Sequence, residues 1–383
     1  MKNTIATLLL MSSAVVLAQD SKPANPPADG RSAGWLKESD KNGDGKLAKA
    51  ETSGLMERFF DRNDANKDGF LDRSELDALA KRLADNQGRR QPQQRRQRVQ
   101  DTEELLRTAP KDVTIVPDLS YREGESKAWK LDLVMPVAKS EKARPAIVFV
   151  HGGGWRNGDK RTRTFLRGAI EYAQKGYVCI TVNYRLVDEA PFPACVNDVK
   201  NAVRWLRANA KKYNLDPKRI GAYGNSAGAH LVCMLGLVTR EAGLEGDGPY
   251  MDYSSLVQAV CASATPTDFL LFEGGLERQG RAGGLLAGPA EGLKGRGKAA
   301  SPIHHVRKDA PPLLLFHGTK DSTVNVKHSD LFVEALKKAG AKDVTYLRID
   351  GAGHGVFNQH KDQSAPAMAK FFARILGLAA PSK

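Results

Sequence analysis

Short apolar runs alternate with longer helical stretches from about residue 111 onward, and this alternation constrains the fold more than any other feature of the chain. Several central runs are apolar without alternation, which is typical of parallel strands covered by helices on both faces. A repeated strand–helix order predicts an α/β layer fold with a mostly parallel, eight-stranded sheet. The expected strands are residues 113–116, 131–135, 146–150, 178–184, 220–223, 257–262, 313–316 and 345–349.

Helical stretches are expected between the later strands. One segment departs from this order, because residues 273–300 are rich in glycine and poor in β-branched residues. We expect an irregular insertion or lid there rather than an element of the core. The expected helices lie near residues 164–175, 194–212, 227–239, 326–339 and 364–377.

Residues 1–18 have the pattern of a secretory signal. Lys2 precedes an apolar run over residues 5–17, and Val16-Leu17-Ala18 places small side chains where a signal peptidase cuts. A membrane anchor is the alternative, but the run is shorter than the ~20 residues that a spanning helix needs. We therefore expect cleavage near Ala18 and a secreted protein, with periplasmic and extracellular destinations left open. No other segment approaches membrane-spanning length.

Two further segments before residue 111 have low-complexity compositions. Residues 19–34 are rich in Pro, Gly and Ser and are expected to be disordered, and residues 86–110 form a linker rich in Arg and Gln. Within the linker, residues 88–98 hold five Arg and no acid, in a chain whose formal net charge is +14. A basic arm can bind nucleic acid, anionic lipid or acidic polysaccharide. Because no aromatic residues interleave with the Arg, we favour a spacer and expect no nucleic-acid partner.

Residues 35–85 are expected to form a small all-α EF-hand pair, because they contain two acidic segments that each match the twelve-residue calcium loop. Oxygens at loop positions 1, 3 and 5 converge on the ion, Gly at position 6 makes the turn, position 7 supplies a carbonyl, and Glu at position 12 binds with both oxygens. One helix, over residues 52–62, must leave the first loop and enter the second, which is more compact than regulatory pairs. Structural calcium is therefore expected. The predicted ligands are Asp40, Asn42, Asp44, Lys46, Glu51, Asp64, Asn66, Asp68, Phe70 and Glu75.

The chain has four Cys residues. Export permits disulfides, and four cysteines allow three pairings, among which the sequence does not choose. Cys179 and Cys261 lie in apolar, strand-like runs, where buried free thiols are the alternative. No Cys pair has the spacing of a metal site.

A glycine run, His151-Gly152-Gly153-Gly154-Trp155, follows the expected strand over 146–150. Without Cβ atoms, backbone N–H groups can closely approach a developing oxyanion. A tight turn is the alternative interpretation. We expect Gly153 and Gly154 to supply oxyanion donors.

The pentapeptide Gly224-Asn225-Ser226-Ala227-Gly228 lies between an expected strand and an expected helix. This is the context of a nucleophile elbow, a strained turn that exposes a serine hydroxyl. The N–H of Ala227 would add an oxyanion donor at the start of the helix. Ser226 is therefore the predicted nucleophile.

An acid and a base follow in the order that such a site requires. Asp321 comes just after the strand over 313–316, and His354 lies in a glycine loop after the last strand. Asp268 is the rival acid. His354 would take the Ser226 proton, Asp321 would orient the imidazole, and no metal is needed for these steps. Among the other histidines, His151 and His317 are expected to have structural or backbone-bonding roles, and His304, His305, His328 and His360 to lie at the surface.

These motifs resemble the α/β-hydrolase superfamily, and more narrowly the esterases related to hormone-sensitive lipase. Asn183-Tyr184-Arg185-Leu186 and Ser301-Pro302-Ile303 look like the bacterial acetyl and feruloyl esterase branch. The resemblance covers about residues 111–380. It implies hydrolysis of short-acyl or aromatic-acyl esters, with acetyl or feruloyl esters of polysaccharide as candidate substrates.

Two other functions remain open at this stage. A prolyl-oligopeptidase-like peptidase shares the fold and the order of the three residues, although the N-terminal segments are too short to build a propeller. A calcium-binding surface protein with a decayed hydrolase domain is the non-catalytic alternative. The intact set of Ser, His, Asp and Gly residues argues against decay.

Overall fold

The computed structural model describes residues 36, 39–52, 60–80, 103–124, 126–272, 275–280 and 283–377. The chain divides into two compact units, Met1–Gln97 and Arg98–Lys383. The predicted signal over residues 1–18 and the disordered segment over 19–34 lie outside the described residues, as does most of the linker over 86–110. Those assignments stay predictions, as do the boundaries of the segment over 35–85 and of the domain over 111–380.

An eight-stranded sheet forms the centre of the larger unit, in the order β10-β9-β8-β7-β5-β6-β4-β3. β3 pairs antiparallel with β4, and β4 antiparallel with β6, whereas all other neighbours are parallel. The sheet is therefore mostly parallel, as predicted. Its strands are β3 (Val113–Ser120), β4 (Lys130–Pro136), β5 (Arg144–Val150), β6 (Val178–Val182), β7 (Leu215–Asn225), β8 (Ala259–Ser263), β9 (Leu313–Gly318) and β10 (Val344–Ile349).

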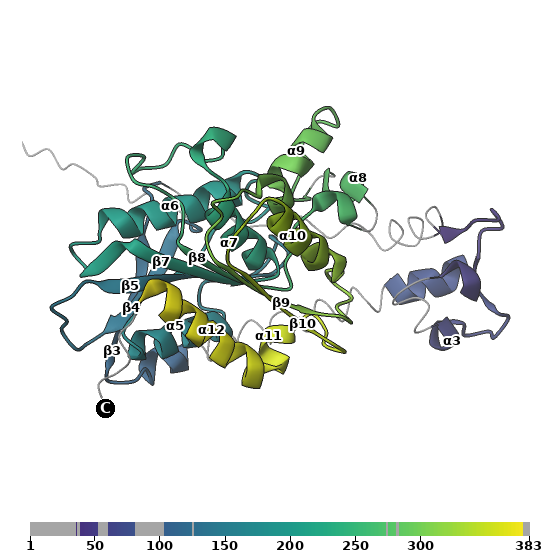
Figure 1. Ribbon diagram of the computed structural model, residues 1–383. Helices are drawn as coiled ribbons and strands as arrows, with labels where there is room; N and C mark the ends of the chain where they lie inside the picture. The colour runs from purple at the N-terminus through teal and green to yellow at the C-terminus, as the bar shows by residue number, and fades with distance from the viewer. Residues whose placement is uncertain are drawn as a thin grey trace, which may run out of the picture. The chain divides into compact units, whose positions relative to one another are not determined.

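Helices cover both faces of this sheet (Figure 1). On one face lie α6 (Ala194–Ala208), α7 (Ala227–Leu237) and α10 (Lys327–Lys338), and on the other α5 (Arg163–Gln174), α11 (Val356–Gln359) and α12 (Lys361–Leu376). Side chains alternate along each strand, so β5 places Val148 in the apolar cluster of the first face and Phe149 in that of the second. A strand buried on both sides explains the unbroken apolar run in the sequence.

The segment over 273–300 was predicted to be irregular, and this was wrong for two parts of it. α8 (Gly275–Gly280) and α9 (Leu293–Ala300) are helices that pack against each other. A Cβ at Gly297 would lie 2.5 Å from Leu276 Cδ2, so glycine here permits a close helix contact instead of breaking structure. Short 3-10 turns complete this part of the fold: η2 (Arg240–Ala242), η3 (Phe269–Leu271) and η4 (Pro302–His305).

The smaller unit contains a two-stranded antiparallel ladder, in which β1 (Leu47–Ala48) pairs with β2 (Phe70–Leu71). The prediction that this unit is all-α was therefore wrong, because residues of the two expected loops pair with each other. The short elements η1 (Lys49–Glu51) and α3 (Phe60–Asn63) lie between these strands in the sequence. A small apolar core forms from Leu47, Phe60, Leu71 and Leu76.

All four cysteines, Cys179, Cys195, Cys233 and Cys261, are buried free thiols in the larger unit. Burial raises the pKa of each thiol, which disfavours the reactive thiolate. Among the described residues, no helix is long and apolar enough to cross a membrane.

Candidate active site

Ser226 lies at the sharp turn between β7 and α7. Its backbone has φ 54° and ψ −122°, a conformation that residues with a side chain rarely adopt. Two hydrogen bonds hold this turn: Ser226 N donates to Ser263 O at 2.9 Å, and Ser226 O accepts from His230 N at 3.0 Å. The strained conformation presents the hydroxyl at the carboxyl end of the parallel strands, as the elbow motif predicts.

The glycines around Ser226 are required by close backbone contacts. A Cβ at Gly224 would lie 2.3 Å from Gly228 O, and a Cβ at Gly228 would lie 2.1 Å from Val150 O. Both neighbours are backbone atoms and cannot rotate away. The tight crossing of β5, β7 and α7 therefore depends on glycine at both positions.

The structure brings the three predicted triad residues together from three separate loops. His354 Nε2 lies 3.0 Å from Ser226 Oγ, and His354 Nδ1 lies 2.8 Å from Asp321 Oδ2. Asp321 follows β9 and His354 follows β10, so neighbouring parallel strands deliver both side chains to the same edge of the sheet. The Asp321 side chain is fully buried, whereas the His354 side chain keeps 28% of its surface exposed and is open to a substrate.

Asp321 is surrounded by hydrogen-bond donors. Its Oδ1 accepts from Thr323 N at 2.8 Å and from Val324 N at 2.9 Å. Burial alone would raise the pKa of this carboxyl, but hydrogen bonds from His317, His354 and the two N–H groups outweigh burial and hold the pKa well below its usual range. The carboxylate therefore stays ionised and can orient the His354 imidazole.

His317 is the residue whose part in this site the sequence did not predict. Its Nε2 lies 2.9 Å from Val324 O and 3.2 Å from Asp321 Oδ2. A carbonyl oxygen can only accept, so this nitrogen carries the hydrogen. The expected backbone contact is present, and the contact with Asp321 comes in addition. The i,i+4 spacing at the end of one strand was the available signal.

The predicted oxyanion donors lie at or next to a pocket that is lined by Ser226. Gly153 has φ 121° and Gly154 has φ 62°, which glycine tolerates. Neither N–H donates to an acceptor within the described part of the chain, so both are free for a ligand. Ala227 is the first residue of α7, where a helix leaves its N–H groups unpaired. Gly154 and Ser226 line one pocket, and Gly153 and Ala227 are their chain neighbours.

Asp268, the rival acid, and His328, one of the histidines predicted at the surface, both lie outside the hydrogen-bonded relay. Asp268 accepts from Leu270 N at 2.9 Å and caps η3, and it has no contact with His354. His328 was predicted at the surface, and this was wrong: it is only 1% exposed. Its Nδ1 accepts from the N–H groups of Thr267 and Asp268, at 3.3 Å each, because it lies on the buried face of α10.

The pocket at Ser226 has a volume of about 340 Å³. Its walls combine apolar side chains such as Val187, Phe272 and Leu285 with the glycines at 283 and 284. Arg156 lines one side of the pocket, where it donates to Asp188 at 3.1 Å and to the carbonyl of Gly283. A pocket of this size admits a small acyl group.

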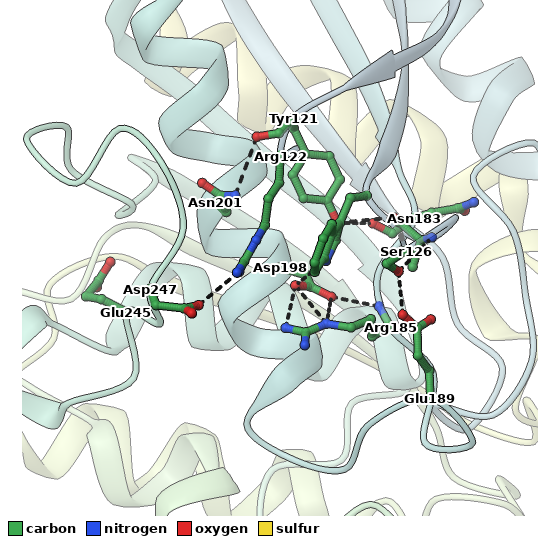
Figure 2. A network of polar contacts seen from close by, with 12 residues as sticks. Tyr121, Arg122, Ser126, Asn183, Arg185, Glu189, Asp198, Asn201, Glu245 and Asp247 are labelled. Carbon is green, nitrogen blue, oxygen red and sulfur yellow. Dashed lines mark hydrogen bonds and ion pairs between the residues drawn. The ribbon is translucent and has the colours of Figure 1, made fainter. Parts of the chain in front are cut away.

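A polar network holds the segment over 183–189 beside the pocket (Figure 2). Arg185 donates to the buried Asp198 from its backbone N at 2.8 Å and from Nη2 at 2.9 Å. Tyr121 donates to Asn183 O at 2.9 Å. Val187 N in turn donates to Trp155 O at 2.9 Å, which links this segment to the glycine loop. The network therefore positions the wall that Val187 contributes.

The predicted calcium loops show part of the expected geometry. Gly45 and Gly69, at loop position 6, have φ 78° and 86°. Asp40 accepts from Gly45 N at 2.9 Å, and Asp64 accepts from Gly69 N at 3.0 Å. Within residues 39–52 and 60–80, as elsewhere in the described chain, no three His, Cys, Asp or Glu side chains gather as a metal-binding group. The EF-hand pair and its calcium therefore stay predictions.

Solved structures resemble this chain over about 70% of its length. A carbohydrate esterase from gut microbiota superposes with a TM-score of 0.61 at 28% identity, over 69% of this chain and 97% of the other. Esterase Est2 of Thermogutta terrifontis with bound propionate gives 0.57 at 28% identity, over 71% and 97%. The fold and these likenesses place the larger unit in the α/β-hydrolase class, and the similar solved structures are named esterases.

Sequence comparison shows to which protein family the chain belongs. Residues 131–336, just over half of the chain, match the BD-FAE family model, and the chain belongs to that family. Esterase LipC of Mycobacterium tuberculosis is 31% identical over 241 residues, covering 61% of this chain and 58% of LipC. Esterase LipQ of the same organism is 31% identical over 221 residues, covering 55% and 50%. This chain thus spans less than two thirds of either relative, and its catalytic unit groups with carboxylic ester hydrolases.

Proposed function

We propose that this protein is a serine carboxylesterase that hydrolyses short-acyl or aromatic-acyl esters, with Ser226, His354 and Asp321 as its triad. The hydrogen-bonded relay carries the proposal, since Ser226 Oγ, His354 and Asp321 are joined at 3.0 Å and 2.8 Å. Such a relay activates a serine for attack on an acyl carbon.

In the first half-reaction, Ser226 Oγ attacks the ester carbonyl while His354 Nε2 takes its proton. His354 then gives this proton to the departing alcohol, which leaves an acyl-enzyme. Water repeats the sequence and releases the acid. Asp321 stays ionised throughout and stabilises the imidazolium that forms.

The N–H groups of Gly153, Gly154 and Ala227 are the proposed oxyanion donors. The unpaired N–H groups of Gly153 and Gly154, in a glycine loop, support this assignment. Each such donor is worth about 3 kcal/mol in the transition state because it is preorganised for the negative charge.

Short acyl groups and carbohydrate alcohols are the proposed substrate class. The pocket volume of about 340 Å³ favours a small acyl group. One similar structure is named a carbohydrate esterase, and another was solved with propionate. Acetyl esters of polysaccharide fit this class, and feruloyl esters are the aromatic-acyl alternative within the same proposal.

Secretion and structural calcium belong to the same proposal. The signal pattern over residues 1–18 supports export, and the two loop motifs support calcium in the smaller unit. The carboxylates of Asp40, Glu51, Asp64 and Glu75 would hold the ions, which would tie the loops together and supply no chemistry to Ser226.

Turnover of p-nitrophenyl esters of increasing chain length tests the central proposal. Wild type should prefer the shortest acyl groups, and Ser226→Ala should lose more than ~10³-fold in kcat/KM. Ser254→Ala, which changes an exposed serine, is the matched control. An inactive wild type, or a Ser226→Ala variant with full activity, would overturn it. Acetate release from acetylated xylan, compared with ferulate release from methyl ferulate, then ranks the substrates.

A further inference from the structure

A second cavity is lined by residues of α5, α11 and α12 and of the strands β5 and β7. These three helices lie on the opposite face of the sheet from α7 (Figure 1). Its volume is about 140 Å³, and it shares no lining residue with the pocket at Ser226. A dry protein cavity of about 150 Å³ is known to hold benzene. The space is therefore large enough for one aromatic ring.

Aromatic side chains form the walls of this cavity. Tyr223 lies at the centre, with its ring centroid 4.9 Å from that of Phe357 and 5.9 Å from those of Phe149 and Phe165. Tyr172 lies 6.0 Å from Phe149. These spacings allow edge-to-face and tilted contacts, which a further ring could extend.

Two hydroxyl groups in these walls have no partner. Tyr172 and Tyr223 are each only 7% exposed, yet neither Oη makes a hydrogen bond within the described chain. Neither oxygen is fully sealed, because neither is among the buried polar atoms without a partner. A buried tyrosine hydroxyl normally finds a partner. Because Tyr172 and Tyr223 both line the cavity, a ligand in it that accepts hydrogen bonds would give these hydroxyls a partner.

Charged side chains around the cavity favour an anion. Arg167, Lys175 and Lys361 line it together with one acid, Glu171, whose Oε1 lies 3.6 Å from Lys361 Nζ. Lys175 Nζ lies 5.5 Å from the Tyr172 ring centroid. Burial raises the pKa of both tyrosines, so at neutral pH they remain donors.

We propose that this cavity binds a single-ring aromatic carboxylate. The ring would lie among Phe149, Phe165 and Phe357, and the carboxylate would accept from the Tyr172 and Tyr223 hydroxyls near the cationic side chains. This is a binding site separate from the catalytic pocket, and it does not depend on the proposed ester hydrolysis.

An occupant would contact both chain segments that carry the relay. Asn225, which lines the cavity, directly precedes Ser226, and Phe357 follows shortly after His354 in the sequence. Because the two pockets share no residue, aromatic acids should change kcat without competing with the ester. An aromatic acid in this cavity and an ester in the pocket at Ser226 should therefore be bound at the same time.

Titration calorimetry with benzoate, on the full chain carrying Ser226→Ala, tests this site whether or not Ser226 is a reactive nucleophile. We expect saturable binding with a dissociation constant of about 1 mM or below. The Tyr172→Phe/Tyr223→Phe variant should bind benzoate at least tenfold more weakly but keep its affinity for toluene, because only the hydroxyls are lost. Benzylamine, which reverses the ligand charge, should not bind.

A cavity-filling variant completes the test. Ala365 lines the cavity, and Ala373 is exposed on the same helix outside it, so Ala365→Phe should abolish benzoate binding and Ala373→Phe should preserve it. Thermal melting of each variant checks folding. The proposal is overturned if wild type fails to bind benzoate, if the two Phe variants bind equally, or if a crystal soaked in benzoate holds only water in the cavity.

Discussion

His317 Nε2 lies 3.2 Å from Asp321 Oδ2, the same carboxylate oxygen that accepts from His354 Nδ1 at 2.8 Å. The buried acid thus lies between two imidazoles. His354 faces the pocket, and His317 is fully buried behind the acid, with its Nδ1 2.7 Å from Ser329 Oγ. Other charged or titratable groups on this side are His328 on α10 and, beside it, Asp268.

Replacing His317 should therefore alter the pH dependence of catalysis. Without this donor, the charge on Asp321 is less neutralised and holds the proton on His354 more strongly. The acid limb of the kcat/KM profile should move to higher pH by about half a unit in His317→Leu, and kcat should fall about tenfold with little change in KM.

His317→Gln is the matched control, because its amide can still donate from nearly the same position. It should keep the acid limb of wild type. If both variants have a lower melting temperature but the same acid limb of the kcat/KM profile as wild type, His317 has a structural role alone.

Asp321 should also contribute to the stability of the fold, and this contribution should be lost in acid. Its pKa is lowered in the folded protein, so the unfolded chain takes up the proton first as the pH falls. The contribution is full above the usual carboxyl pKa of about 4 and is lost as pH falls through the lowered value. The melting-temperature difference between wild type and Asp321→Asn should therefore shrink between neutral pH and about pH 3. Asp252→Asn, which changes an exposed acid, should show a constant difference, and a parallel course for Asp321→Asn would contradict the linkage.

The strands and the triad residues could be predicted because their signals are local. Buried parallel strands leave unbroken apolar runs, and the elbow leaves glycines around Ser226. The acid was chosen by its place after a strand, and in the structure Asp321 contacts His354 whereas Asp268 caps η3. The contact of His317 with Asp321 was missed although the i,i+4 spacing was visible in the sequence. The burial of His328 could not be predicted, because it depends on which face of α10 packs against the loop after β8. The helices α8 and α9 were missed because glycine serves close packing there.

Breaking the buried cluster of Glu245 with Lys200 and Arg204 should strongly destabilise the fold. Glu245 accepts from Lys200 Nζ and from Arg204 Nη1, each at 2.6 Å, and both cations are fully buried. Glu245→Gln would leave two buried cations without a counter-charge, which should cost about 3 kcal/mol or more in the free energy of unfolding. Urea denaturation measures this change.

Asp247 offers the contrast on the same loop. It pairs with Arg122 at 3.0 Å, but its side chain is 85% exposed (Figure 2). Asp247→Asn should cost less than about 1 kcal/mol, because solvent screens an exposed pair. Equal losses for Glu245→Gln and Asp247→Asn would show that burial does not govern these pairs.

Chelation should separate the stability of the smaller unit from catalysis. Glu51 now accepts from Lys41 N and Ala48 N, each at 3.0 Å, and Glu75 from Ala65 N at 2.7 Å, which sets both position-12 carboxylates inside their loops. Ions bound only to the folded state stabilise it by about 2.7 kcal/mol at a hundred times the dissociation constant. EDTA should therefore lower the melting temperature of this unit, as measured by calorimetry. Esterase activity at room temperature should persist. Glu51→Gln/Glu75→Gln should remove the response to calcium, and Glu103→Gln, outside the loops, should keep it. An abrupt loss of activity on chelation would instead mean that calcium acts on the catalytic unit.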